Sequence, residues 1–183
     1  MRKITRPGVI ILSLAGLVFS LLLTAWLMPG GLELRVTPVK GGKPLLVLLL
    51  EPGERFTIHY YHSVENAPIW EEHSLDEKGR IYIEEERYLK FGAGMGQMPG
   101  VGRMVRRGTY KVIENMHMPT GDFILRIGSP GVDHTILWRG ISKNLSLMAP
   151  HEAVRFSGRP VNILYRLWRC LVPHQANPYL RSK

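Results

Sequence analysis

The chain has 183 residues, a formal net charge of +9 and a hydrophobic fraction of 45%. This length fits one domain with an attached segment, and the hydrophobic fraction is too high for a disordered chain. The single cysteine excludes an intrachain disulfide framework and a zinc site built from several thiolates. The sequence also lacks a Walker loop, the glycine-lysine motif that holds nucleotide phosphates.

An uncharged apolar run covers residues 9–27, directly after three basic residues. At about 1.5 Å per residue, a helix over this run is about 28 Å long, close to the thickness of a bilayer core. The exit from Ala25 to Gly31 lacks a good small-x-small cleavage site, so we predict an uncleaved signal anchor rather than a cleaved signal peptide. The basic residues predict a cytoplasmic N-terminus, with Trp26 at the outer interface and the main domain in the periplasm.

The net charge of the predicted exported domain indicates what kind of partner it would bind. Removing Arg2, Lys3 and Arg6 from the count lowers the net charge from +9 to +6. In an exported domain, this charge favours anionic lipid or an acidic protein face as the partner. No aromatic-plus-basic motif for RNA or DNA is present, so we expect no nucleic-acid partner.

Three parts follow from these patterns: residues 1–31 as stub and anchor, 32–158 as an exported domain, and 159–183 as a basic helix and tail. In the middle part, short apolar or β-branched runs alternate with turns containing Pro or Gly. This pattern predicts a mainly β fold, a small antiparallel β-sandwich or barrel-like domain. The runs 45–50 and 55–64, separated by Pro52-Gly53, predict a β-hairpin. Further strands are predicted at 69–75, 80–86, 109–114, 123–127 and 135–138, with weaker ones at 145–148 and 153–156.

The last part predicts an amphipathic helix of about 12 residues. Apolar residues recur at helical spacing from Val161 to Val172, Pro160 suits a first helical position, and Pro173 ends the pattern. Such a helix is too short to span a bilayer.

Two roles for this helix stay open. It either covers one end of the β domain, or it lies at an interface with a membrane or a partner. In the second case Tyr165 and Trp168 would be buried, and Arg166 and Arg169 would reach lipid headgroups.

Two short motifs carry a resemblance to a known family. One is His62-Ser63-Val64-Glu65, followed by Pro68 and Glu71, and the other is Phe91-Gly92-Ala93-Gly94-Met95. With these motifs, the stretch from Leu45 to Leu147 resembles the bacterial domain of unknown function family 1850. The resemblance implies a short exported or membrane-tethered protein encoded beside TAXI-type TRAP transporters, and it implies no catalytic residues.

The resemblance therefore implies a non-enzymatic accessory module in solute uptake. Its partner would be the membrane subunit of the transporter or its solute-binding protein. The expected contact, or small ligand pocket, consists of His62, Ser63, Glu65, Glu71, Gly92, Gly94, Met95 and Arg103.

Other chemistry for the same polar cluster stays open. Two histidines or a histidine with carboxylates can hold a metal, but His59 and His62 would point to opposite faces of a strand. His62, Glu65 and Glu71 are therefore the candidate metal ligands in a metal-binding exported protein. The simpler alternative is a structural network in which these groups fix a turn. We expect no cofactor, with a metal as the alternative.

The glycine-rich stretch 92–102 fails the Gly-x-Gly-x-x-Gly pattern of dinucleotide sites. We predict a loop that covers a pocket or presents backbone amides, followed by Arg103 as a candidate for binding an anion. A solvated basic loop is the alternative. A third function is a structural envelope protein that holds membrane or a partner through its C-terminal helix.

Overall fold

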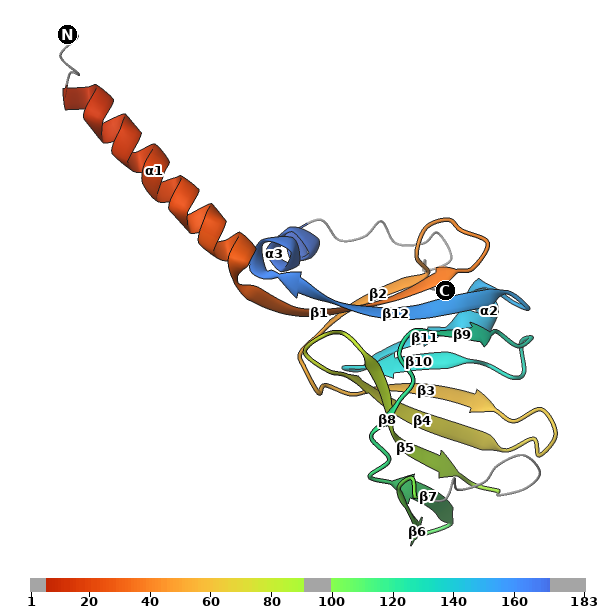
Figure 1. Cartoon of the computed structure of the whole chain (residues 1–183). Coiled ribbons are helices and arrows are strands. Elements are labelled where there is room, and N and C mark those ends of the chain that lie inside the picture. The colour runs from red at the N-terminus through yellow and green to blue at the C-terminus, as the bar shows by residue number, and fades with distance from the viewer. Residues whose placement is uncertain (1–5, 91–99, 172–183) are drawn as a thin grey trace.

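The structure is a computed structural model that describes residues 6–90 and 100–171. Two antiparallel sheets form the body, and a long helix projects from one end of it (Figure 1). The prediction of a mainly β domain with a helix at each end is confirmed. Among the described residues, neither sheet closes on itself, so the domain is not a closed barrel.

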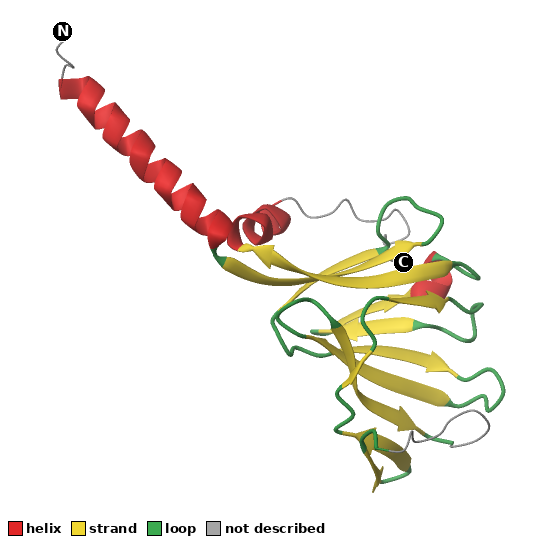
Figure 2. Cartoon of the chain, viewed as in Figure 1, coloured by secondary structure: helices red, strands yellow, loops and turns green. Residues whose placement is uncertain are grey.

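The first sheet has four strands, in the spatial order β2 (Leu46–Leu50), β1 (Pro29–Pro38), β12 (Ala153–Asn162) and β9 (Phe123–Arg126). The second sheet has the order β11 (Ile141–Asn144), β10 (Thr135–Trp138), β3 (Phe56–Tyr61), β4 (Pro68–Leu75), β5 (Ile81–Tyr88), β7 (Tyr110–Glu114) and β6 (Arg103–Arg107), and β8 (Met118–Pro119) pairs with β5. The helices are α1 (Arg6–Leu27), α2 (Leu145–Met148) and α3 (Ile163–Leu171), shown in red in Figure 2.

The core lies between the two sheets, because each strand turns alternate side chains inward. Phe56 and Ile58 of β3 pack there with Leu34 of β1 and Phe156 of β12, all almost fully buried. Gly158 of β12 lies directly against the turn between β4 and β5, where an added Cβ would lie 2.1 Å from the carbonyl oxygen of Gly79.

The predicted hairpin around Pro52-Gly53 is wrong. β2 pairs with β1 in the first sheet, whereas β3 pairs with β4 and β10 in the second. The backbone N–H of Gly53, at φ +74°, donates to the carbonyl of Leu75 at 2.8 Å. The turn therefore carries the chain from one sheet to the other. The same turn residues also occur in hairpins, so the local sequence does not tell the two connections apart.

The long strand β1, which the sequence patterns did not predict, changes the C-terminal boundary as well. β1 pairs with β12 from Val154 through Pro160 and again at Asn162. Because these pairs hold the chain extended, α3 begins at Ile163 and not near Pro160 as predicted.

The N-terminal helix α1 is apolar and stands apart from the β domain (Figure 1). Residues Ile10–Leu27 are long and apolar enough to cross a membrane, and none of that window is buried. Such a helix suits a membrane anchor or a signal sequence.

Candidate ligand pocket

A cavity of about 370 Å³ opens at the end of β3. Its walls come from segments far apart in the chain: the end of β3, the end of β9, the loop before β10 and the turn before β12. The N–H of Tyr61 donates to the carbonyl of Val132 at 2.8 Å and ties two of these segments together. The polar or aromatic side chains in the wall are Tyr60, Tyr61, His62, Ser63, Arg126, His134 and His151.

His62 holds the turn that follows β3. Its Nδ1 atom accepts the backbone N–H groups of Glu65 at 3.2 Å and Val64 at 3.3 Å. An Nδ1 atom that accepts carries no proton, so the neutral ring has its proton on Nε2. The side chain therefore fixes the turn and leaves an N–H donor for the pocket.

His134, which also lines the pocket, uses its Nδ1 atom in the same way. Its Nδ1 accepts the N–H of Gly128 at 3.0 Å, and its ring stacks on Tyr60 with 5.0 Å between ring centres. Burial lowers the pKa of His134, which keeps the ring neutral near neutral pH. Among the described residues, its Nε2 has no hydrogen-bond partner.

Tyr60 connects the pocket to the partly buried carboxylate of Glu71. Its hydroxyl donates to Glu71 Oε1 at 2.8 Å, and burial followed by the charge of Glu71 raises the pKa of Tyr60. The second oxygen of Glu71 lies 3.4 Å from Nε2 of His73. His73 is 1% exposed and stacks between Phe56 and Phe123. Its Nδ1 is the one buried side-chain nitrogen or oxygen without a partner in the described part of the chain.

A second carboxylate follows on β5. Glu86 lies opposite Glu71 in the β4–β5 register and accepts a hydrogen bond from the hydroxyl of Tyr88. Burial raises the pKa of Glu86, and the charge of Glu71 acts in the same direction. The inner face of the second sheet thus carries two carboxylates, each with its own tyrosine donor.

The structure brings together only some of the predicted site residues. His62 and Ser63 line the pocket, and Glu71 reaches it through Tyr60. Glu65 lies in the adjoining turn, where its carbonyl accepts from Lys90 at 3.4 Å. Gly92, Gly94 and Met95 lie outside the described residues.

Arg103, the candidate for binding an anion, is the first residue of strand β6 and does not lie in a loop. Its guanidinium pairs with Glu114 of β7 at 2.6 Å. Hydrogen bonding to Arg103 first, and then to Arg107, lowers the pKa of Glu114. Strand pairing thus turns Arg103, together with Arg107, toward a carboxylate of the protein itself.

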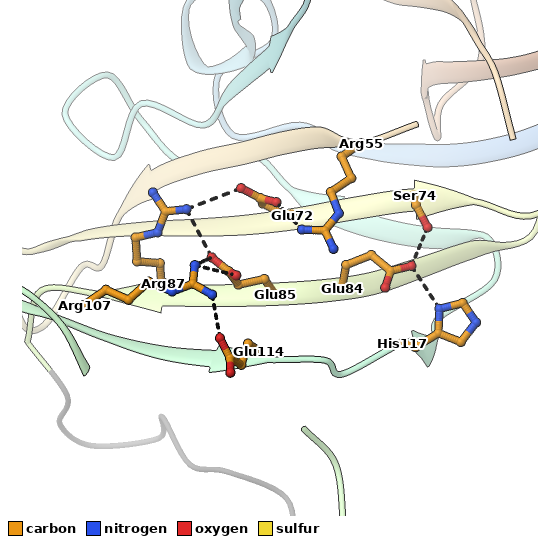
Figure 3. A network of polar contacts seen from close by, with 9 residues as sticks. All are labelled: Arg55, Glu72, Ser74, Glu84, Glu85, Arg87, Arg107, Glu114 and His117. Carbon is orange, nitrogen blue, oxygen red and sulfur yellow. Dashed lines mark hydrogen bonds and ion pairs between the residues drawn. The ribbon is translucent and has the colours of Figure 1, made fainter. Parts of the chain in front are cut away.

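These pairs belong to a larger charge network on the outer face of the second sheet (Figure 3). The carboxylates come from β4, β5 and β7, and the guanidinium groups come from β5, β6 and the residue before β3, so Glu72, Glu85 and Glu114 each pair with an arginine. The network includes pairs Arg55–Glu72 (2.8 Å), Arg87–Glu72 (3.3 Å), Arg87–Glu85 (3.1 Å), Arg107–Glu85 (2.9 Å) and Arg107–Glu114 (2.6 Å), and Glu84 joins Ser74 (2.5 Å) to His117 (3.0 Å). It stabilises the sheet and offers little unpaired charge to a ligand.

The proposed metal ligands are not assembled. Among the residues that the structure describes, no group of three His, Cys, Asp or Glu side chains is placed to hold a metal ion. Nδ1 of His62 is engaged by the turn, and Glu71 by Tyr60 and His73. The geometry corresponds to the structural alternative, in which these groups fix a turn and a buried network.

Sequence reasoning missed Arg126, His134 and His151 as pocket residues. Each stands alone in its local sequence, and only the fold brings it beside His62. Tyr60 could have been predicted from the sequence. It lies two residues before His62, and side chains two apart on a strand point to the same face of the sheet.

Residues 56–145 match the family model described as Domain of unknown function (DUF1850). This part of the chain resembles the DUF1850 family. The match runs from the start of β3 to the first residue of α2, so it includes His62 and His134 but neither α1 nor α3. Comparisons with curated proteins and with solved structures gave no match.

Proposed function

We propose that this protein is a membrane-tethered, extracytoplasmic module that binds a carboxylate-bearing ligand in support of solute uptake and catalyses no reaction. The observation that carries the proposal is the set of donors around the pocket. His62 and His134 both use Nδ1 as an acceptor, which leaves two imidazole N–H groups, and Arg126 adds a guanidinium. Donors of this kind bind carboxylate oxygens.

The pocket also lacks the usual arrangement for nucleophilic catalysis. Ser63 follows His62 directly, and in the described structure no hydrogen bond joins its hydroxyl to a histidine. A serine nucleophile needs a base within hydrogen-bond reach. A binding role, for the carboxylate of a small solute or of an acidic side chain on a partner, therefore fits the pocket best.

The proposed role in solute uptake is supported by the membrane anchor and by the likeness to the DUF1850 family. The apolar helix α1 supports attachment to the cytoplasmic membrane with the β domain outside. The likeness to the DUF1850 family supports an association with a TAXI-type TRAP transporter. The partner is then the transporter membrane subunit or the solute-binding protein that delivers the solute.

The test is affinity purification of the tagged full chain from native membranes in mild detergent, followed by mass spectrometry. We expect a TRAP membrane subunit or solute-binding protein to co-purify, and the Arg126→Ala variant to recover less of it. Arg155→Ala is the matched control, because this exposed arginine on β12 lies outside the pocket. Absence of any transporter component, or equal losses in both variants, would contradict the proposal.

A further inference from the structure

Helix α3 is amphipathic, but it faces the domain with its polar side. In a surface helix the apolar stripe normally packs on the core. Here none of the residues of α3 is buried. The apolar side chains point outward, with exposed fractions of 37% for Leu164, 54% for Leu167, 51% for Trp168 and 81% for Leu171.

Specific contacts hold the polar side against the first sheet. The hydroxyl of Tyr165 donates to Glu33, a fully buried carboxylate of β1. Arg166 donates to the carbonyl of Gly30 at 2.8 Å and pairs with Glu51 at 2.6 Å. The side chain of Asn162 accepts the N–H of Tyr165 at 2.8 Å and caps the helix. The outward direction of the apolar side is therefore fixed by the fold.

The start of α3 lies against the exit of α1. The N–H of Ile163 donates to the carbonyl of Met28 at 3.1 Å, and an added Cβ on Gly30 would meet the backbone of Asn162 at 2.3 Å. Both helices lie on the side of the first sheet that faces away from the second sheet (Figure 1). In that view α1 lies in the plane and α3 is seen nearly end-on, so α3 runs across the direction of α1.

We infer that α3 docks its exposed apolar side on the outer surface of the bilayer that α1 spans. The inference rests on the tether in the proposed function and adds a second membrane contact, which fixes the orientation of the β domain. A helix that lies across a membrane-spanning helix at its exit lies parallel to the bilayer surface. Its apolar side chains would enter about 5–10 Å into the headgroup and acyl boundary.

Lipid suits this surface better than a second copy of the chain. Four exposed large apolar side chains on nine residues form a small patch, whereas a stable protein interface buries about 800 Å² on each partner. The helix α1, which α3 contacts, also carries exposed apolar groups at its end, including Trp26 and Leu27. Because α1 already holds α3 at the surface, even a weak contact forms readily.

The chain supplies its own probe for a test. Cys170 is the only cysteine, is exposed and lies on α3. The full chain is labelled there with an environment-sensitive fluorophore and reconstituted in lipid nanodiscs at one copy per disc. We expect blue-shifted emission and quenching by lipids that carry a spin label near the headgroup. The double variant Leu167→Asn, Leu171→Asn should reduce both effects.

The matched control carries the fluorophore at Val64→Cys in a Cys170→Ser background. Val64 is exposed in the turn after β3, remote from α1, and should show no quenching. An unquenched probe at Cys170 overturns the inference, as does a signal that appears only with two copies per disc. Retention of the full chain in alkali-washed native membranes is measured in parallel. Loss from those membranes overturns the tether and the inference together, whereas retention with an unquenched probe overturns the inference alone.

Discussion

Replacing Tyr60 with Phe isolates the hydrogen bond that connects the pocket to the partly buried carboxylate of Glu71. The substitution keeps the ring that stacks on His134 at 5.0 Å and removes only the hydroxyl that donates to Glu71 at 2.8 Å. Glu71 then retains His73 as its side-chain partner, at 3.4 Å. We therefore expect a loss of stability without a large change in packing.

The expected magnitude follows from the charge of the acceptor. A hydrogen bond to a charged group contributes about 1.5–3 kcal/mol to the free energy of unfolding. With a urea dependence of about 2 kcal/mol per molar for a domain of this kind, the unfolding midpoint should fall by about 1 M. The ring stays in place, so no cavity term adds to this loss.

The assay is urea unfolding of the detergent-solubilised full chain, followed by tryptophan fluorescence, to which Trp70 and Trp138 of the second sheet contribute. Tyr61→Phe is the control, because this neighbour is 38% exposed and its hydroxyl makes no hydrogen bond within the described residues. We expect Tyr61→Phe to stay within about 0.5 kcal/mol of the unmodified protein. Equal midpoints for Tyr60→Phe and Tyr61→Phe would refute the role assigned to this hydrogen bond.

Two further substitutions probe the fold around the pocket. Burial raises the pKa of Glu86 above its ordinary 4.5, so its contribution to stability is complete below that pH and is lost as the pH rises through the folded pKa. Glu86→Gln should therefore gain stability relative to the unmodified protein as the pH increases above 4.5. Urea unfolding at a series of pH values measures this, and a constant difference in unfolding free energy between the two proteins would contradict it. Gly158→Ala should cost about 1–3 kcal/mol, because its Cβ would overlap the carbonyl of Gly79, whereas Ser157→Ala should be near neutral. Thermal unfolding of the two variants measures the difference, and similar melting temperatures would count against the close approach of Gly158 to the turn at Gly79.

Strand periodicity predicted which side chains share a face. Phe56, Ile58 and Tyr60 of β3 do point into the core, as alternation requires, and Glu71 and His73 share the inner face of β4. These predictions succeed because the period of a strand is a local property.

Pairing between strands that are distant in the chain could not be predicted from the local sequence. β1 pairs with β12 across more than half of the chain, and no local pattern identifies that partner. The same long-range pairing brings Arg126 and His151 beside His62 and turns Arg103 toward Glu114. The orientation of α3 also escaped prediction, since amphipathic spacing identifies two sides of a helix but not which one meets the domain.

The position of the pocket relative to α1 distinguishes the two proposed partners. β12 starts two residues after His151, which lines the pocket, and ends at Asn162, beside the exit of α1. Its 10 residues span about 30 Å at about 3.3 Å per residue, so the pocket opens well away from the membrane-proximal end of the domain. A soluble solute-binding protein reaches such a position more readily than a subunit embedded in the bilayer. A photo-crosslinker at Ser63 should therefore capture the solute-binding protein in native membranes, and one at Leu171 should not. Capture of the membrane subunit from Ser63 would instead mean that the domain lies flat on the transporter, with the pocket turned toward the bilayer.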